Sequence, residues 1–180
     1  MGGVKPWWVP SVDFLKGALL TFAGKTAEGQ LVAAVGSAWR RILKALAQHP
    51  EEFLRMAPRD FEQFIAGCYD RDGYTVTLTP ASGDLGRDVI AEKPSVGTIR
   101  ILDQVKRFKP GHLVTADDVR AFLFVAREDR ATKCFITTTS DFAPLLVSDR
   151  LIAPYIESAF LELRSRERTI AWLRELEEKI

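Results

Sequence analysis

An amide and an ammonium group lie two residues apart in "RILDQVKRFK", residues 100–109, a stretch with the alternating pattern of a β-strand. Because side chains alternate along a strand, Leu102, Gln104 and Lys106 are expected on one face and Asp103 on the other. An amide oxygen can bind a hard divalent cation, and a lysine ammonium can bind an anionic phosphate. The pair is therefore a candidate for chemistry on a phosphodiester.

A carboxylate opens the strand that precedes this one. The segment "RDVIAEK", residues 87–93, also reads as a strand, and the short turn "PSVG" would join the two strands as an antiparallel hairpin. The hairpin would bring Asp88 close to Gln104 and Lys106. Since Mg²⁺ prefers oxygen ligands, Asp88 and the side-chain oxygen of Gln104 form a candidate metal site.

Further groups would complete such a site. The backbone carbonyl of Val105 would supply another oxygen, and Glu62, on the helix expected before the hairpin, would add a carboxylate through a bound water. Lys106 would orient or deprotonate the attacking water, or neutralise charge on the phosphorane. Against this, Asp, Gln and Lys are common solvent-facing residues at strand ends, and the spacing alone favours that interpretation.

The composition is that of an ordinary globular protein with no strong electrostatic field. The chain has 180 residues, which corresponds to one domain or to one domain with an extension. Its formal net charge is +1, with 47% hydrophobic and 27% charged residues. An anionic partner would therefore have to be bound by a local cluster of cations rather than by the charge of the whole protein.

The cysteines and the hydropathy favour a protein of the reducing cytoplasm. Cys68 and Cys134 lie in apolar surroundings without a CxxC pattern and are expected to be buried thiols. The two histidines, His49 and His112, are too scattered to suggest a structural zinc site. The most apolar N-terminal run, "FLKGALLTFAG", is short and charged, so no membrane span is expected.

The expected elements follow the order of a mixed α/β protein with a central sheet covered on both sides. Apolar residues at helical spacing predict helices, and short β-branched runs between turn residues predict strands. The expected helices are 27–48, one from about Pro58 to Gly73, one from about Thr115, most of 141–158, and 167–180. The second would bury a stripe formed by Phe61, Phe64, Ile65 and Cys68, and the third would begin with a capping box of Thr115 and Asp118. The expected strands are 74–79, 87–93, 98–107, 133–139 and 159–164.

Two features of the N-terminal region have simple structural explanations. Arg40, Arg41 and Lys44 lie near the end of the first expected helix, where cations suit the helix dipole, and this is favoured over DNA binding. Trp7 and Trp8 are expected to pack on the body of the protein. The alternative is an interaction protein, in which this segment forms a dimer or binds a larger assembly.

Several ordered motifs give the chain a family resemblance. The segments "PRDFEQFIAGCYDRDGYTVTLTPASGDLGRDVIA", "QVKRF" and "CFITTTSDFAP" resemble the catalytic domain of Mrr-like restriction endonucleases, members of the PD-(D/E)XK nuclease superfamily. The resemblance runs from about residue 50 to 175. It implies a restriction-endonuclease-like α/β/α sandwich with a central mixed sheet over residues 51–180. Residues 1–50 would form an N-terminal helical extension.

The resemblance also implies roles for individual residues. Asp88 would be the metal-binding acid, Lys106 the motif lysine and Glu62 the supplementary acid of the helix. Gln104 would stand where the superfamily more often has Glu or Asp. Leu85 departs from the family pattern, because a glycine is common at its position.

DNA contacts are expected from the loop before the hairpin and from the loop after it. Ser82 and Asp84 would lie near the mouth of the site. Arg87 would either contact DNA or pair with Asp84. Lys109 is expected in the loop that follows the lysine strand, where a phosphate contact would make binding salt-dependent.

The expected function is that of an endodeoxyribonuclease dependent on Mg²⁺ or Mn²⁺. An uncharged amide is a weaker metal ligand than a carboxylate, so the alternative is a catalytically weak or inactive DNA-binding or scaffold protein with the nuclease fold. DNA is the expected partner, and a homodimer is expected because each active site would cut one strand. The sequence contains no nucleotide-binding loop and no recognisable targeting module, so translocation or targeting would require a separate subunit.

Overall fold

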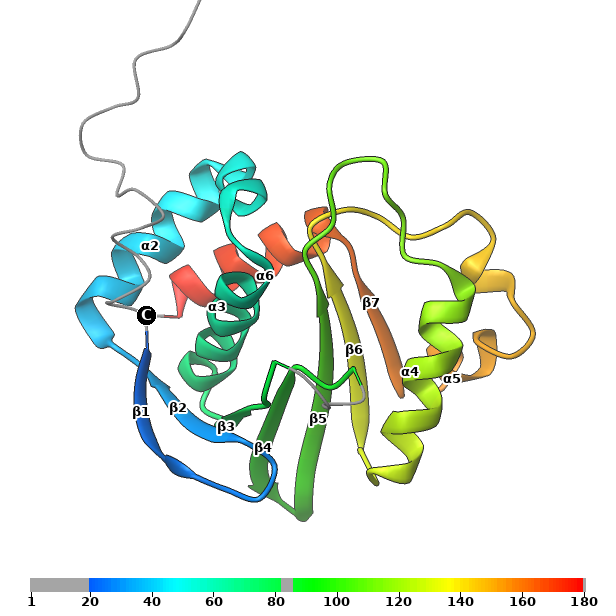
Figure 1. The fold of residues 1–180 in the computed structure, drawn as a ribbon, viewed down its shortest axis with the longest axis horizontal. Helices are drawn as coiled ribbons and strands as arrows, with labels where there is room; N and C mark the ends of the chain where they lie inside the picture. The colour runs from blue at the N-terminus through cyan, green and yellow to red at the C-terminus, as the bar shows by residue number, and fades with distance from the viewer. Residues whose placement is uncertain (1–19, 82–85, 180) are drawn as a thin grey trace, which may run out of the picture.

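The computed structural model describes residues 20–81 and 86–179 of the chain (Figure 1). The described strands form one seven-stranded sheet in the order β1-β2-β3-β4-β5-β6-β7. Neighbouring strands are antiparallel from β1 to β5, whereas β5, β6 and β7 are parallel. The strands are β1 (Leu20–Lys25), β2 (Gln30–Ala34), β3 (Thr75–Leu78), β4 (Val89–Ser95), β5 (Gly97–Lys106), β6 (Lys133–Thr138) and β7 (Leu161–Arg164).

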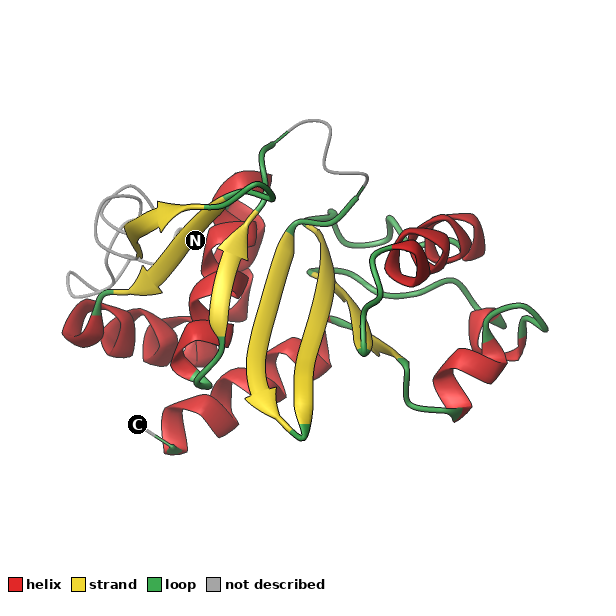
Figure 2. Cartoon of the chain, turned by 90° about the horizontal axis from the view of Figure 1, so that it is seen from below, coloured by secondary structure: helices red, strands yellow, loops and turns green. Residues whose placement is uncertain are grey.

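Helices cover both faces of this sheet (Figure 2). One core lies under α2 (Gly36–Gln48), α3 (Pro58–Arg71) and α6 (Arg166–Glu178). The other lies under α4 (Ala116–Glu128) and the short α5 (Ala153–Glu157). The 3-10 segments η1 and η2 span Pro50–Arg55 and Leu146–Ser148. The expected α/β/α sandwich with a mixed sheet is confirmed.

Helix α3 follows the sequence pattern closely. Pro58 occupies its first turn, where the missing amide hydrogen costs nothing, and Gly73 follows its end with a φ of +88°. The predicted stripe is fully buried against β3, β4 and β5; it comprises Phe61, Phe64, Ile65 and Cys68. This helix carries Glu62 toward the sheet end at which β3 finishes and β4 begins.

The N-terminal region differs from the expected helical extension. The helix predicted over 27–48 begins only at Gly36, because 30–34 form β2 and pair with β3. The segment "QLVAA" has too few residues to separate a helical from a strand period, and pairing with a distant strand decided its structure. The boundary between domains near residue 50 stays a prediction. Trp7 and Trp8 lie outside the described residues.

Two smaller expectations were also wrong. The last turn of α2 contains no basic residue, so Arg40, Arg41 and Lys44 are solvent-exposed side chains rather than charges that stabilise the helix end. The segment 141–158 contains only η2 and α5 as helical elements. Pro144 and Pro154 restrict the backbone there, because proline lacks an amide donor and limits the residue before it.

The hairpin of β4 and β5 forms as expected, and its side chains alternate between the two faces of the sheet as expected. Val89 pairs with Asp103 at one end, and Gly97, with a φ of +94°, makes the turn at the other. Leu102 packs in the core beneath α4, whereas Ile101 packs in the core beneath α3. The alternation read from the sequence is therefore confirmed, and Asp103 points into the interior beneath α3.

The carboxylate of Asp103 is fully buried and is bonded from three directions. Its Oδ2 accepts hydrogen bonds from the hydroxyls of Tyr69 at 2.9 Å and Thr137 at 2.8 Å. Arg164 of β7 approaches the same oxygen to 3.3 Å. Burial raises the pKa of Asp103, while Arg164 acts in the opposite direction. The guanidinium of Arg164 also stacks 3.9 Å from the ring centroid of Trp172.

The two cysteines are buried and free, as expected. Burial raises the pKa of Cys134 to about 12 and that of Cys68 well above its usual value. Among the described residues, no helix has the length and apolar character that crossing a membrane requires.

Substitution of Arg164 by Met should strongly destabilise the fold. It would leave Asp103 buried without its cation, a change that typically costs about 3–5 kcal/mol of unfolding free energy. Urea denaturation followed by circular dichroism measures the loss. The exposed Arg174 on α6 offers a matched control, and Arg174→Met should change the unfolding free energy by less than about 0.5 kcal/mol. Equal effects of the two substitutions would contradict this role for Arg164.

Candidate active site

Asp88 lies where β4 begins, and its side chain is bonded to the next strand. Its Oδ2 accepts a 2.6 Å hydrogen bond from the backbone amide of Val105, and its own amide donates to the carbonyl of Asp103. The β4–β5 pairing starts at Val89, so β5 extends past the end of its neighbour here. The Asp88 carboxylate therefore accepts a hydrogen bond that the backbone of a further β4 residue would otherwise accept. Asp88 as a whole is only 9% exposed.

Gln104 lies next to this carboxylate in the sheet and has an unusual environment. Its Oε1 is buried and has no hydrogen-bond partner within residues 20–81 and 86–179. Gly86, with a φ of +79°, lies so close that a Cβ there would be 2.4 Å from Gln104 Nε2. The backbone conformation therefore favours glycine at this position, and a Cβ added here would make the Gln104 amide shift.

Lys106 is held by an acidic residue of α4. Its Nζ lies 3.1 Å from Asp118 Oδ1 and 5.4 Å from the ring centroid of Phe108. Asp118 also accepts hydrogen bonds from the amide and hydroxyl of Thr115, and this completes the predicted capping box. Burial raises the pKa of Asp118, but the bonds from Thr115 and Lys106 outweigh it and lower the pKa overall. The sequence indicated the cap but not this contact with the lysine.

Glu62 is connected to the start of β4 through Arg59. The guanidinium of Arg59 bonds Glu62 Oε2 at 2.7 Å and the carbonyl of Thr79 at 2.7 Å. The amide of Thr79 in turn donates to the carbonyl of Asp88 at 3.1 Å. Sequence reasoning missed Arg59, although its position three residues before Glu62 on the same helix is a usable signal.

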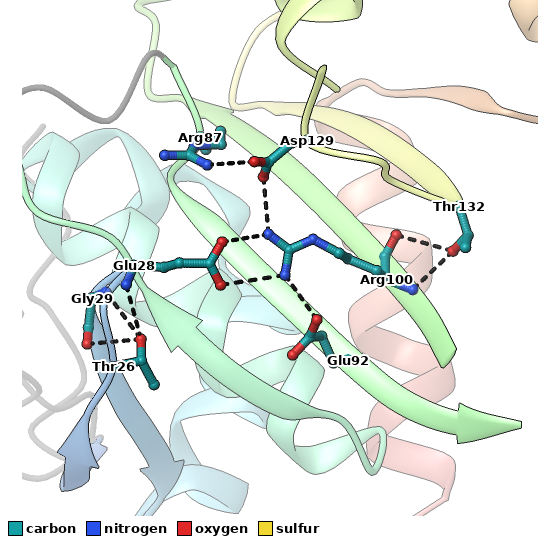
Figure 3. A network of polar contacts seen from close by, with 8 residues as sticks. All are labelled: Thr26, Glu28, Gly29, Arg87, Glu92, Arg100, Asp129 and Thr132. Carbon is teal, nitrogen blue, oxygen red and sulfur yellow. Dashed lines mark hydrogen bonds and ion pairs between the residues drawn. The ribbon is translucent and has the colours of Figure 1, made fainter. Parts of the chain in front are cut away.

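The residues expected to contact DNA have different environments. Lys109 is exposed in the loop after β5, where its carbonyl accepts a hydrogen bond from His112. Arg87 forms a 2.8 Å ion pair with Asp129, at the end of α4 (Figure 3). Ser82 and Asp84 lie outside the described residues, and the expected alternative of an Arg87–Asp84 pair lies there with them.

The oxygens near Asp88 are suited to a hard cation. Within the described part of the chain, no group of three His, Cys, Asp or Glu side chains could hold a metal ion. The Asp88 carboxylate and the neutral oxygens near it are the candidate ligands. The buried Oε1 of Gln104 fits such a site, because a buried acceptor without a partner is costly unless a ligand satisfies it.

Two solved structures of restriction endonucleases are similar to the chain. MspJI restriction endonuclease, in complex with a 27-mer oligonucleotide, is 20% identical, with a TM-score of 0.46 over 80% of this chain and 33% of that chain. The DNA modification-dependent restriction endonuclease AspBHI is 16% identical, with a TM-score of 0.47 over 81% of this chain and 41% of that chain. The chain thus spans less than half of either protein. No curated protein matches it.

A family model described as a restriction endonuclease, the Mrr catalytic domain, matches residues 53–145. The match covers more than half of the chain and runs from η1 past the end of β6. It includes Glu62, Asp88, Gln104 and Lys106, the residues to which the sequence resemblance gave roles. The chain belongs to the Mrr catalytic-domain family of restriction endonucleases.

Proposed function

We propose that this protein is an endodeoxyribonuclease that hydrolyses DNA phosphodiester bonds with the help of Mg²⁺ or Mn²⁺. The observation that carries the proposal is the bond from Val105 to Asp88, which places the carboxylate beside the strand segment that also bears Gln104 and Lys106. Family membership supports the same activity. In this proposal residues 51–180 form the nuclease domain and act in the cytoplasm.

The metal site would be made of oxygens from three adjacent positions. Asp88 would provide the carboxylate, Gln104 its buried Oε1 and Val105 its backbone carbonyl. The amide and the carbonyl of one strand residue point to the same side, so the Val105 carbonyl is expected on the side of Asp88. When bound, the cation would stabilise the charge that develops on the phosphodiester in the transition state.

Lys106 would act on the water or on the phosphate. In the hydrolysis, the oxygen of water forms a bond to phosphorus and gives up a proton, the bond from phosphorus to the leaving oxygen breaks, and the leaving oxygen takes up a proton. The ammonium of Lys106 would donate a hydrogen bond to a phosphate oxygen or orient the water. Asp118 would hold the lysine in place, and Glu62, kept in position by Arg59, would be the auxiliary acid.

The DNA would be contacted from the loops on either side of the hairpin. Lys109 is the best-placed contact, because it is exposed and lies just beyond the lysine of the site. Ser82 and Asp84 stay candidates from the loop before β4, whereas the side chain of Arg87 is paired with Asp129. We further propose that the protein cuts duplex DNA as a homodimer, or under the control of a separate targeting or translocating subunit.

A second candidate function is a catalytically weak or inactive DNA-binding or scaffold protein. The observation that favours it is the ion pair between Glu62 and Arg59 at 2.7 Å, which reduces the negative charge that Glu62 can offer to a cation. Asp88 would then be the main source of negative charge at the site, since Gln104 is neutral. The cleavage experiment below separates the two functions.

Cleavage of supercoiled plasmid tests the nuclease. We expect wild-type protein to nick or linearise methylated or unmethylated plasmid with Mg²⁺ or Mn²⁺ and to be inactive in EDTA. Asp88→Asn and Lys106→Met should each lower the rate by about 100-fold or more, because each removes a charge used in the transition state. Asp88→Asn keeps an oxygen that can accept the bond from Val105, so its fold should be preserved.

Circular dichroism shows whether both variants are folded. Arg174→Met is the control, and it should cleave DNA at the wild-type rate. Cleavage that persists in EDTA or in both site variants would contradict the proposed centre. A folded wild-type protein that binds DNA but cuts no plasmid would favour the second candidate function.

Substitution of Gly86 by Ala should impair cleavage by moving Gln104. The new Cβ would lie 2.4 Å from Gln104 Nε2, so the amide would have to shift away from the site. Gly97→Ala is the matched control, because Gly97 also has a positive φ but a Cβ added there would have no neighbouring atom within 4 Å. Both variants should lose about 1 kcal/mol of stability through backbone strain, while only Gly86→Ala should lose about tenfold or more in cleavage rate. Equal rates for the two variants would rule out a role for the position of Gln104.

A further inference from the structure

Arg87 directly precedes the proposed metal ligand Asp88, and its side chain is turned toward α4 rather than toward solvent. Its Nη1 lies 2.8 Å from Asp129 Oδ1, and both side chains are largely buried, at 18% and 22% exposure (Figure 3). The backbone at this point is held as well, since the hydroxyl of Thr79 donates to the carbonyls of Arg87 and Asp88. Arg87 is therefore fixed at both its main chain and its side chain.

The partner of Arg87 belongs to a larger network. Asp129 uses its second oxygen, Oδ2, to accept a 2.9 Å bond from Arg100 on β5. Arg100 also bonds Glu92 of β4 at 2.8 Å and Glu28 of the β1–β2 turn at 2.5 Å. Figure 3 shows Arg100 at the centre of these contacts. Burial lowers the pKa of Arg100, but its bonds to the three carboxylates outweigh burial and raise the pKa well above its ordinary value.

The charges of this network argue against a DNA contact by Arg87. Two guanidinium groups, of Arg87 and Arg100, face three carboxylates, so the cluster carries a net charge of −1 if all five groups are ionised. A phosphate would have to compete with Asp129 for Arg87 and would approach a region of negative charge. The geometry is better suited to holding the chain than to binding an anion.

Helix α4 contacts both halves of the proposed catalytic centre. Near its first turn, Asp118 bonds Lys106, and immediately after its last turn Asp129 bonds the residue that precedes Asp88. One rigid element thus fixes the lysine and the segment that carries the metal-binding acid. The network also reaches Glu28, which lies outside the family-matched residues 53–145 and ties the β1–β2 hairpin to this arrangement.

We propose that Arg87 is a positioning residue for Asp88 and not a DNA contact. Its ion pair with Asp129 keeps the Asp88 carboxylate against the amide of Val105, where the proposed metal ligands meet. Only the expected effect on catalysis rests on the proposed nuclease function. The position of the Asp88 carboxylate can be measured without catalysis, so the proposed role of Arg87 and the proposed nuclease function can fail separately.

The direct measurement is hydrogen exchange of the Val105 amide by NMR, on the metal-free protein. That amide donates to Asp88 Oδ2 and so reports where the carboxylate lies. Arg87→Gln and Asp129→Asn should each raise its exchange rate by about tenfold. The double variant should add little to Asp129→Asn, because both changes break the Arg87–Asp129 pair, while Asp129→Asn also weakens the bond from Arg100. Arg87→Lys, which keeps a cation, should retain most of the protection.

DNA binding gives the second measurement, with a labelled duplex of about 20 base pairs in EDTA over a range of salt concentrations. Lys109→Gln is the comparison, because Lys109 is an exposed loop cation and its loss should weaken binding and reduce the salt slope by about 1. Arg87→Gln should leave the affinity within about twofold of wild type and the slope unchanged. None of these substitutions changes a residue of the two hydrophobic cores, and circular dichroism checks that each variant is folded.

The proposal is overturned if the Val105 amide keeps wild-type protection in Arg87→Gln, or if this variant loses DNA affinity and salt slope as Lys109→Gln does. A wild-type protein that cuts no DNA would remove the nuclease proposal alone, because the exchange and binding results would still decide the role of Arg87. If cleavage is present, Arg87→Gln and Asp129→Asn should reduce its rate to a similar extent.

Discussion

Strand β5 extends past the beginning of β4, and the arrangement of the site depends on how its last amide groups are satisfied. A buried amide without an acceptor would cost on the order of 1–3 kcal/mol. The carboxylate of Asp88 satisfies the amide of Val105 at 2.6 Å. The side chain that completes the sheet is thus the same one that we propose as a metal ligand, and folding itself brings it beside the strand segment that bears Gln104 and Lys106.

Consecutive side chains of β5 point to opposite faces of the sheet. Asp103 points into the core beneath α3, where Arg164 and Tyr69 bind it. Gln104 and Lys106 belong to the other face, toward Gly86 and α4. A shift of the strand by one residue would place Leu102 or Gln104 in the position of Asp103 and would leave Arg164 without a partner. The buried ion pair thus helps to fix the register that places the candidate site.

Local patterns in the sequence were enough to predict the α/β/α fold, because turns, strand alternation and the cap at Thr115 depend on near neighbours. The residues of the candidate site were proposed through the family resemblance, because their spacing alone favoured ordinary solvent-facing side chains, and their roles stay a prediction. Long-range contacts decided the rest. Segment 30–34 became a strand because it pairs with β3, which lies beyond α2, η1 and α3 in the chain. The partners of Lys106 and Arg87 are likewise remote acids, and neither charge nor spacing in the sequence distinguishes Asp118 or Asp129 from other surface carboxylates in and around α4.

The strand order of the sheet is the same as the order of the strands in the chain, from β1 to β7. Each strand therefore pairs only with strands that precede or follow it directly, and no pairing has to wait for the distant end of the polypeptide. During synthesis the sheet could grow from its N-terminal edge, one strand at a time, at a modest entropic cost for each loop. Arg164, on the last strand, would join Asp103 at the end of this process, so the buried charge of β5 would be neutralised only when the sheet is complete.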